Sequence, residues 1–130
     1  MELTWKFATP IPVEDIEKVA AENGVTLSPY LIQVIHEGNN GEPSKNIFSY
    51  GKDKEDIFKT LLSYRKTDME NIYRALRILK EEGNKLYPFG NDPGGNLICL
   101  DGEEVVLWDS ETNSSSFIAN NVMAFFEGLQ

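Results

Sequence analysis

Residues 86–109 read LYPFGNDPGGNLICLDGEEVVLWD, and this stretch decides the fold. Short apolar runs alternate here with two turn sequences, Asn91–Gly95 and Asp101-Gly102. Runs rich in branched and aromatic side chains, bounded by Gly, Pro, Asn and Asp, are typical of strands joined by tight turns. The stretch therefore predicts three consecutive strands, over 86–90, 96–100 and 105–108.

Helical patterns precede these strands. Over 12–24, a proline and acidic residues open a run of apolar side chains at helical spacing, which an Asn-Gly pair ends. Over 28–38, a Ser-Pro pair opens a second helix. Thr67 to Glu70 form a capping box for a third helix, whose apolar stripe begins at Met69 and which Gly83-Asn84 closes.

Three further segments complete the pattern. Asn46 to Tyr50 predicts a strand followed by a turn. Residues 57–64 stay open between a strand and a short helix, with a strand favoured for the first half. A Ser- and Asn-rich loop over 110–116 leads to a final helix, whose apolar side is expected to include Phe117 and Ile118. Helices before and after a meander of strands predict an α+β domain.

Composition narrows the class of protein. The chain has 130 residues, of which 41% are hydrophobic and 25% charged, so we expect a single domain over 1–130 with a packed core. No apolar run approaches the ~20 residues of a membrane span, and residues 1–12 show no secretory signal. The single cysteine, Cys99, fits a reducing compartment. We therefore expect a cytoplasmic protein without membrane association.

The negative charge is concentrated near one end of the chain. The formal net charge is −9, and residues 86–130 hold seven acidic residues and no Lys or Arg. Such a surface repels phosphate backbones and attracts basic partners, so direct nucleic-acid binding is not expected. The alternative, that the acidity only keeps the protein soluble, stays open.

Few side chains suit catalysis. His36 is the only histidine and falls near the end of a predicted helix, where the dipole favours it, and Cys99 lies in an apolar strand. One Cys and one His cannot supply the four ligands of a zinc site. Asp92, Asp101 and Asp109 flank strand ends, so a metal or acid–base pair is an alternative to turn chemistry. We predict no enzyme activity, no cofactor and no metal.

Several segments, taken in order, also carry a family resemblance. They are LSPY at 27–30 with NNGEP at 39–43, PFG at 88–90 with GGNLICLD at 94–101, VVLWD at 105–109, and a closing helix with Ile118-Ala119 and 125–129. This order resembles the SUKH superfamily, the group of Smi/Knr-type cell-wall-assembly regulators and bacterial immunity proteins. Two departures are Glu42, in place of a usual second glycine, and Asn121-Val122, in place of a common Ser-Phe.

The resemblance implies an α+β domain with a central, mostly antiparallel sheet flanked by helices and no catalytic activity. It also implies an immunity protein that binds and neutralises a polymorphic toxin, often a nuclease. A nuclease is basic around its substrate groove, so the acidic chain and the resemblance agree on a basic cognate toxin domain as partner. The alternatives are a scaffold or regulatory module in a signalling or cell-envelope pathway and a metal-dependent hydrolase using Asp92, Asp101 and Asp109. Self-association into a homodimer is also open.

Partner contacts are expected at exposed polar positions on the acidic side, with the 39–43 loop as a second rim. Trp108 is interpreted as a core residue, with a partner anchor as the alternative. The candidate partner-binding residues are Asn40, Glu42, Asp92, Asn96, Asp101, Glu103, Glu104, Trp108, Asp109 and Glu111.

Overall fold

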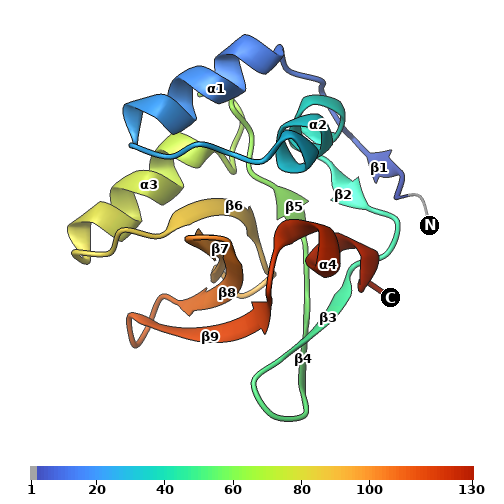
Figure 1. The fold of residues 1–130 in the computed structure, drawn as a ribbon, viewed down its shortest axis with the longest axis vertical. Helices are drawn as coiled ribbons and strands as arrows, with labels where there is room; N and C mark the ends of the chain where they lie inside the picture. The colour runs from blue at the N-terminus through green and yellow to red at the C-terminus, as the bar shows by residue number, and fades with distance from the viewer. Residues whose placement is uncertain (1–2) are drawn as a thin grey trace.

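A five-stranded antiparallel sheet forms the centre of the protein (Figure 1). The structure is a computed structural model, and it describes residues 3–130. Its strands are Thr60–Leu61 (β5), Tyr87–Asn91 (β6), Leu97–Asp101 (β7), Glu104–Asp109 (β8) and Ser114–Ala119 (β9). They lie in the order β5-β6-β7-β8-β9, so each strand pairs with its sequence neighbour. The predicted meander over 86–109 and the α+β class are therefore confirmed.

Four helices accompany the sheet among the described residues, and two of the predicted helix starts are confirmed. The helices are Val13–Glu22 (α1), Pro29–Gly38 (α2), Ile72–Glu81 (α3) and Val122–Glu127 (α4). Figure 1 shows α1, α2 and α3 gathered on one side of the sheet, with α4 next to α2. Ser28 caps α2 because its hydroxyl accepts the Leu31 N–H at 3.2 Å.

Two short antiparallel pairs lie outside the main sheet. Trp5–Lys6 (β1) pairs with Glu42–Pro43 (β2), and Ile47–Tyr50 (β3) pairs with Lys54–Ile57 (β4). The β3–β4 hairpin projects from the body of the molecule (Figure 1). Its base is held by Gln130, whose N–H and carbonyl both bond to Ile47 at 3.0 Å.

A cluster of phenylalanines fills the space between α4 and the sheet. Phe58, Phe89, Phe125 and Phe126 are all at most 3% exposed, and their ring centroids lie 5.1 to 6.2 Å apart. Gly90 in β6 is the residue that lets Phe58 approach the sheet, since a Cβ at this position would overlap the Phe58 ring. The cluster therefore ties the C-terminal helix α4 to strand β6 and to the segment between β4 and β5.

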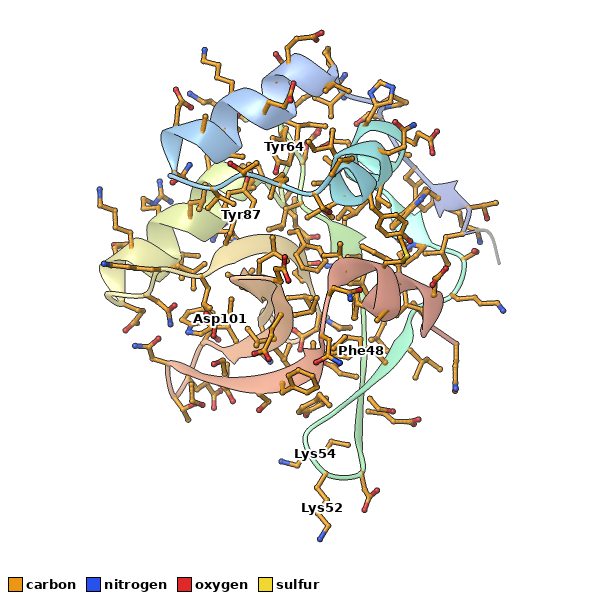
Figure 2. All side chains as sticks on the ribbon, in the orientation of Figure 1. Phe48, Lys52, Lys54, Tyr64, Tyr87 and Asp101 are labelled. Carbon is orange, nitrogen blue, oxygen red and sulfur yellow. The ribbon has the colours of Figure 1, made fainter. Side chains whose placement is uncertain are left out.

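A second buried contact joins β6 to the segment before α3. The hydroxyls of Tyr64 and Tyr87 lie 2.8 Å apart and are buried (Figure 2). Burial raises the pKa of Tyr87 to about 12, so both phenols stay protonated at neutral pH.

The structure corrects the start of the third helix. Helix α3 begins at Ile72, and its cap is Asn71, whose side chain accepts the Arg74 N–H at 2.9 Å. The predicted capping box is wrong, because Glu70 instead pairs with Lys59. Met69 is 84% exposed and is no part of an apolar stripe.

The structure also corrects the segment before the last helix. Phe117 and Ile118 belong to strand β9, and helix α4 starts only at Val122. Strand β9 is largely exposed, so its burial pattern gives little alternation to recognise. The open segment 57–64 contains the last residue of β4 and both residues of β5. The strand favoured for its first half is therefore interrupted, because Phe58 and Lys59 belong to neither strand.

Candidate interaction surface

The strand register divides the predicted acidic residues between two ends of the sheet. Asp101 pairs with Glu104 at the β7–β8 turn. The β6–β7 turn over 92–96 and the β8–β9 loop over 110–113 lie at the other end of the same strands. A strand of five residues spans about 17 Å, so the two groups do not form one continuous patch.

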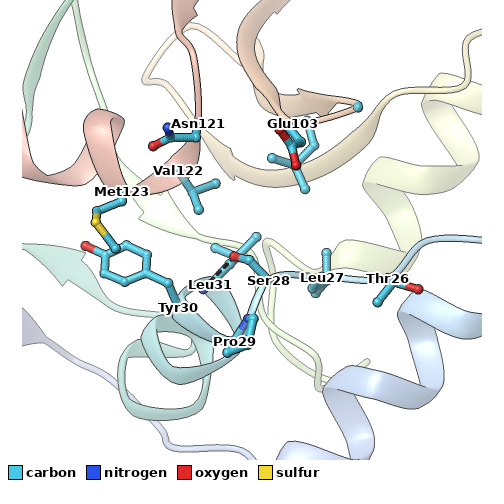
Figure 3. A pocket seen from close by; sticks show the side chains of 12 residues that line it. Thr26, Leu27, Ser28, Pro29, Tyr30, Leu31, Glu103, Asn121, Val122 and Met123 are labelled. Carbon is cyan, nitrogen blue, oxygen red and sulfur yellow. Dashed lines mark hydrogen bonds between the residues drawn. The ribbon is translucent and has the colours of Figure 1, made fainter.

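A groove lies beside the β7–β8 turn, between the starts of α2 and α4 (Figure 3). Its volume is about 540 Å³. Three segments far apart in the sequence line it, namely 26–31, 100–103 and 121–123. The first of these contains the LSPY segment, so the fold brings that segment next to the acidic hairpin.

The floor of the groove is apolar. Leu27, Leu31 and Val122 are buried, whereas Tyr30 is half-buried and Met123 is 48% exposed. Tyrosine and methionine are both enriched at protein–protein interfaces. These two side chains therefore give the groove an accessible contact surface above a buried apolar base.

The rim of the groove is acidic. Glu103 lines it directly, and Asp101 and Glu104 are exposed on the same turn. Burial, and next the nearby Glu127 carboxylate, raise the pKa of the Tyr30 phenol. No Lys or Arg is among the residues that line the groove. An apolar floor with an acidic rim suits a partner that presents an apolar side chain flanked by Lys or Arg.

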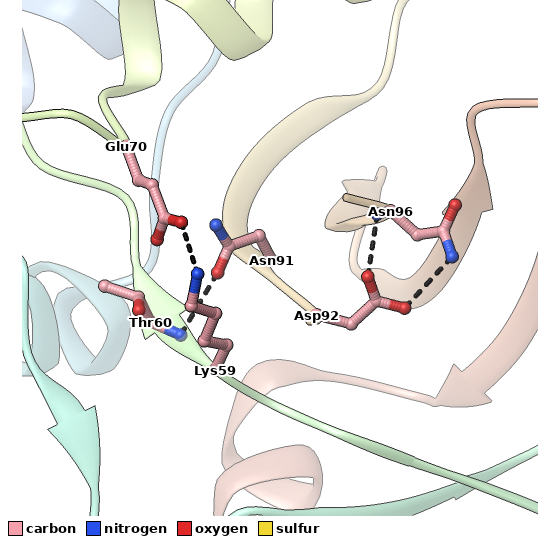
Figure 4. A network of polar contacts seen from close by, with 6 residues as sticks. All are labelled: Lys59, Thr60, Glu70, Asn91, Asp92 and Asn96. Carbon is pink, nitrogen blue, oxygen red and sulfur yellow. Dashed lines mark hydrogen bonds and ion pairs between the residues drawn. The ribbon is translucent and has the colours of Figure 1, made fainter. Parts of the chain in front are cut away.

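Asp92 and Asn96 hold the β6–β7 turn together (Figure 4). One Asp92 carboxylate oxygen accepts the Asn96 N–H at 2.7 Å, and the other accepts the Asn96 side-chain amide at 3.0 Å. Asp92 is only 5% exposed, so its expected exposure is wrong. Its carboxylate satisfies donors of its own turn, which is the usual reason for aspartate in such a loop.

A second carboxyl group meets Asp92 from the projecting hairpin. Asp56 of β4 is hydrogen-bonded to Asp92. Burial first, and then this hydrogen bond, raise the pKa of Asp56 to about 7. The sequence gives no signal for this pair, because the two residues are 36 positions apart.

Trp108 lies in the core, which confirms its favoured interpretation, and it is not exposed as the alternative role of partner anchor requires. The side chain is 1% exposed, and its indole N–H donates to the Asn113 side chain at 2.8 Å. Asn113 in turn donates to the Glu82 carbonyl at 3.1 Å. Trp108 therefore ties the β8–β9 loop to the end of α3.

The remaining predicted residues lie in two other places. Asp109 is half-buried and accepts the Glu111 N–H at 2.8 Å, while Glu111 is exposed at the end of the sheet opposite the groove. Asn40 and Glu42 line a separate shallow depression with Lys59 and Glu70. Lys59 and Glu70 form an ion pair at 2.6 Å there (Figure 4).

The residues considered for catalysis are dispersed. Asp101 lies at the end of the sheet opposite Asp92 and Asp109, and no group of three or more His, Cys, Asp or Glu within residues 3–130 is placed to hold a metal. His36 contacts the Ile11 carbonyl through Nδ1 at 2.6 Å. Cys99 is fully buried, as predicted, and burial raises the pKa of its thiol. No helix in the described part of the chain is long and apolar enough to cross a membrane.

The groove itself was not predicted from the sequence. Its walls come from 26–31, 100–103 and 121–123, and only the tertiary packing of α2 and α4 brings them together. The resemblance to SUKH motifs includes residues of two walls, at 27–30 and 100–101, and departs from the motif at Asn121-Val122 in the third, and it contains no statement that these segments meet.

Comparison with known proteins identifies one match. The model of the SMI1/KNR4 family (SUKH-1) matches residues 10–128, which include every wall of the groove. No curated protein and no solved structure matches the chain significantly.

Proposed function

The chain belongs to the SMI1/KNR4 family (SUKH-1), and on that premise we propose that it is an immunity protein that binds and neutralises a cognate toxin domain. The toxin domain is basic and of the nuclease type. The protein acts in the cytoplasm by stoichiometric binding, without catalysing a reaction.

The observation that supports this proposal is the groove with its acidic rim. Burial of its apolar floor by a partner would favour binding, because apolar surface is removed from water. The carboxylates of Asp101, Glu103 and Glu104 favour a basic partner. A nuclease needs Lys and Arg around its substrate groove to neutralise phosphates. An acidic surface seated on those residues competes with the nucleic acid for the same charges.

Charge reversal on the rim tests the proposal. Tagged wild-type protein and an E103K/E104K variant are used as baits in the native cells, and the bound proteins are eluted with increasing salt. The expected result is a basic protein with a toxin domain that wild type retains to high salt and the variant releases. Two reversed rim charges should weaken binding at least about tenfold, because like charges then face each other.

The matched control is E81K/E82K, which makes the same charge change at the end of α3. Retention of the toxin domain by the control and its loss by E103K/E104K supports the proposal. Equal retention by all three baits contradicts it. Recovery of several signalling or envelope proteins at low salt, with no toxin domain, would favour the scaffold alternative instead.

A further inference from the structure

A second groove, of opposite charge, lies between the end of α1 and helix α3. Its volume is about 520 Å³. Val25, Leu76 and Leu86 are half-buried and give it an apolar floor. Its charged lining residues are all cationic, and they are Arg77, Lys80 and Lys85.

We propose that this cationic groove binds an acidic segment of a partner protein. The three cations come from the stretch 67–85, in which acidic and basic residues are balanced in number. The structure places three of the four basic residues of that stretch on one groove.

Within residues 3–130, none of these three cations has an acidic partner within 4.0 Å. Among residues 3–130 the ion pair within 4.0 Å is Lys59–Glu70, although the chain contains 21 acidic residues. Lys80 lies in the last turn of α3, where the helix dipole favours a cation. Arg77 and Lys85 have no such local explanation, which leaves them available to an external anion.

Two carboxylates of α1 lie near one side of the groove, but the charged residues that line the groove are all cations. Burial first, and then the carboxylates of Asp15 and Glu22 in α1, raise the pKa of the Tyr73 phenol, and Lys66 Nζ lies 5.1 Å from the centre of the same ring. Both carboxylates thus act at the Tyr73 side of the groove, where Lys66 opposes them. Arg77, Lys80 and Lys85 line the groove without a charged residue of opposite sign among its lining residues.

The apolar floor favours a peptide over a nucleic acid. A net charge of −9 repels any long polyanion that extends beyond the groove. A short segment with carboxylates and one or two apolar side chains satisfies both the cations and the floor. Arg77 adds the planar fork that binds a carboxylate with two hydrogen bonds.

Fluorescence anisotropy with a labelled hexapeptide of Glu, Leu and Phe tests the proposal. Wild-type protein should bind this peptide, and 0.3 M salt should weaken the binding. An R77E/K80E variant should bind at least tenfold more weakly. A K52E/K54E variant carries the same charge change at the tip of the β3–β4 hairpin (Figure 2) and should bind like wild type. Circular dichroism at the same temperature checks that both variants are folded.

Three outcomes would overturn the proposal. The first is no anisotropy change with wild-type protein at 1 mM. The second is an equal loss in R77E/K80E and K52E/K54E, which would show only a general effect of charge. The third is tighter binding of a labelled single-stranded oligonucleotide that R77E/K80E abolishes, which would make the groove a nucleic-acid site. None of these results depends on whether the acidic groove binds a toxin.

Discussion

Replacing Asp56 by asparagine should stabilise the protein at neutral pH. Asp56 is hydrogen-bonded to Asp92, and this contact requires a proton between the two carboxyl groups. In D56N the side-chain amide donates in place of that proton. The amide oxygen still accepts the Ile57 N–H, which lies 2.8 Å from the Asp56 carboxyl in the wild type. The variant therefore imitates the protonated form at every pH.

The size of the effect follows from the pKa of Asp56. Burial first, and then the hydrogen bond to Asp92, raise it from an ordinary 3.8 to about 7. Because the folded pKa is raised, this group favours folding fully below about pH 4, and the contribution is lost as pH rises to about 7. A shift of this size on a fully buried group is worth about 4 kcal/mol. Asp56 is partly exposed, and solvent screening reduces this to about 1–2 kcal/mol.

Urea unfolding at pH 4, 5, 6, 7 and 8, followed by tryptophan fluorescence, measures the free energy of unfolding of both proteins. We expect no difference at pH 4 and a gain for D56N of about 1–2 kcal/mol at pH 8. The matched control is E55Q, which removes one charge from the outer face of the same strand. A difference between D56N and wild type that stays constant from pH 4 to 8 would refute the reasoning, as would an equal gain in E55Q.

Three further predictions concern the core and the thiol. In G90A the new methyl group overlaps the buried Phe58 ring, so the free energy of unfolding should fall by about 3 kcal/mol in chemical denaturation. An unchanged midpoint would show that the phenylalanine cluster adjusts freely. In N39A the Tyr64 N–H loses the buried acceptor that lies 2.9 Å away, so unfolding should cost about 2–4 kcal/mol less. N39D should lose at least as much, because its buried carboxylate cannot donate to the Thr9 carbonyl or the Ser63 hydroxyl, to which the Asn39 amide donates at 3.2 Å. Cys99 should react with a thiol reagent only after unfolding, because burial disfavours its thiolate, and rapid labelling of the native protein would contradict this.

Strong local signals explain which parts of the fold could be predicted. The three strands of 86–109 combine apolar runs with Gly, Pro, Asn and Asp turns, and each turn fixes where its strands end. Helix α2 has a Ser-Pro start that the structure uses as a cap. These features act over a few residues, so they are visible without knowledge of the packing.

The segments that were misread depend on distant partners. Thr67 to Glu70 match a capping box, but Glu70 finds Lys59, which lies 11 residues away, and the helix starts later with an Asn cap. The helical spacing of Phe117 and Ile118 with the residues of α4 arises by coincidence. Pairing with β8 decides that they form a strand, because tertiary pairing overrides local propensity.

The candidate site could be predicted even less well than the fold, because the net charge of a segment does not say where its charged residues lie on the surface. The excess of acid in residues 86–130 predicts a single acidic side, yet β7 and β8 carry Asp101 and Asp109 to opposite ends of the sheet. Conversely, the balanced stretch 67–85 suggests no charged surface, yet the turn of α3 gathers Arg77 and Lys80 on one groove. An on-rate that falls with salt would therefore not identify which groove binds a partner. Only charge reversal at one groove, matched by an equal reversal elsewhere, separates the two, because the overall field changes equally in both variants.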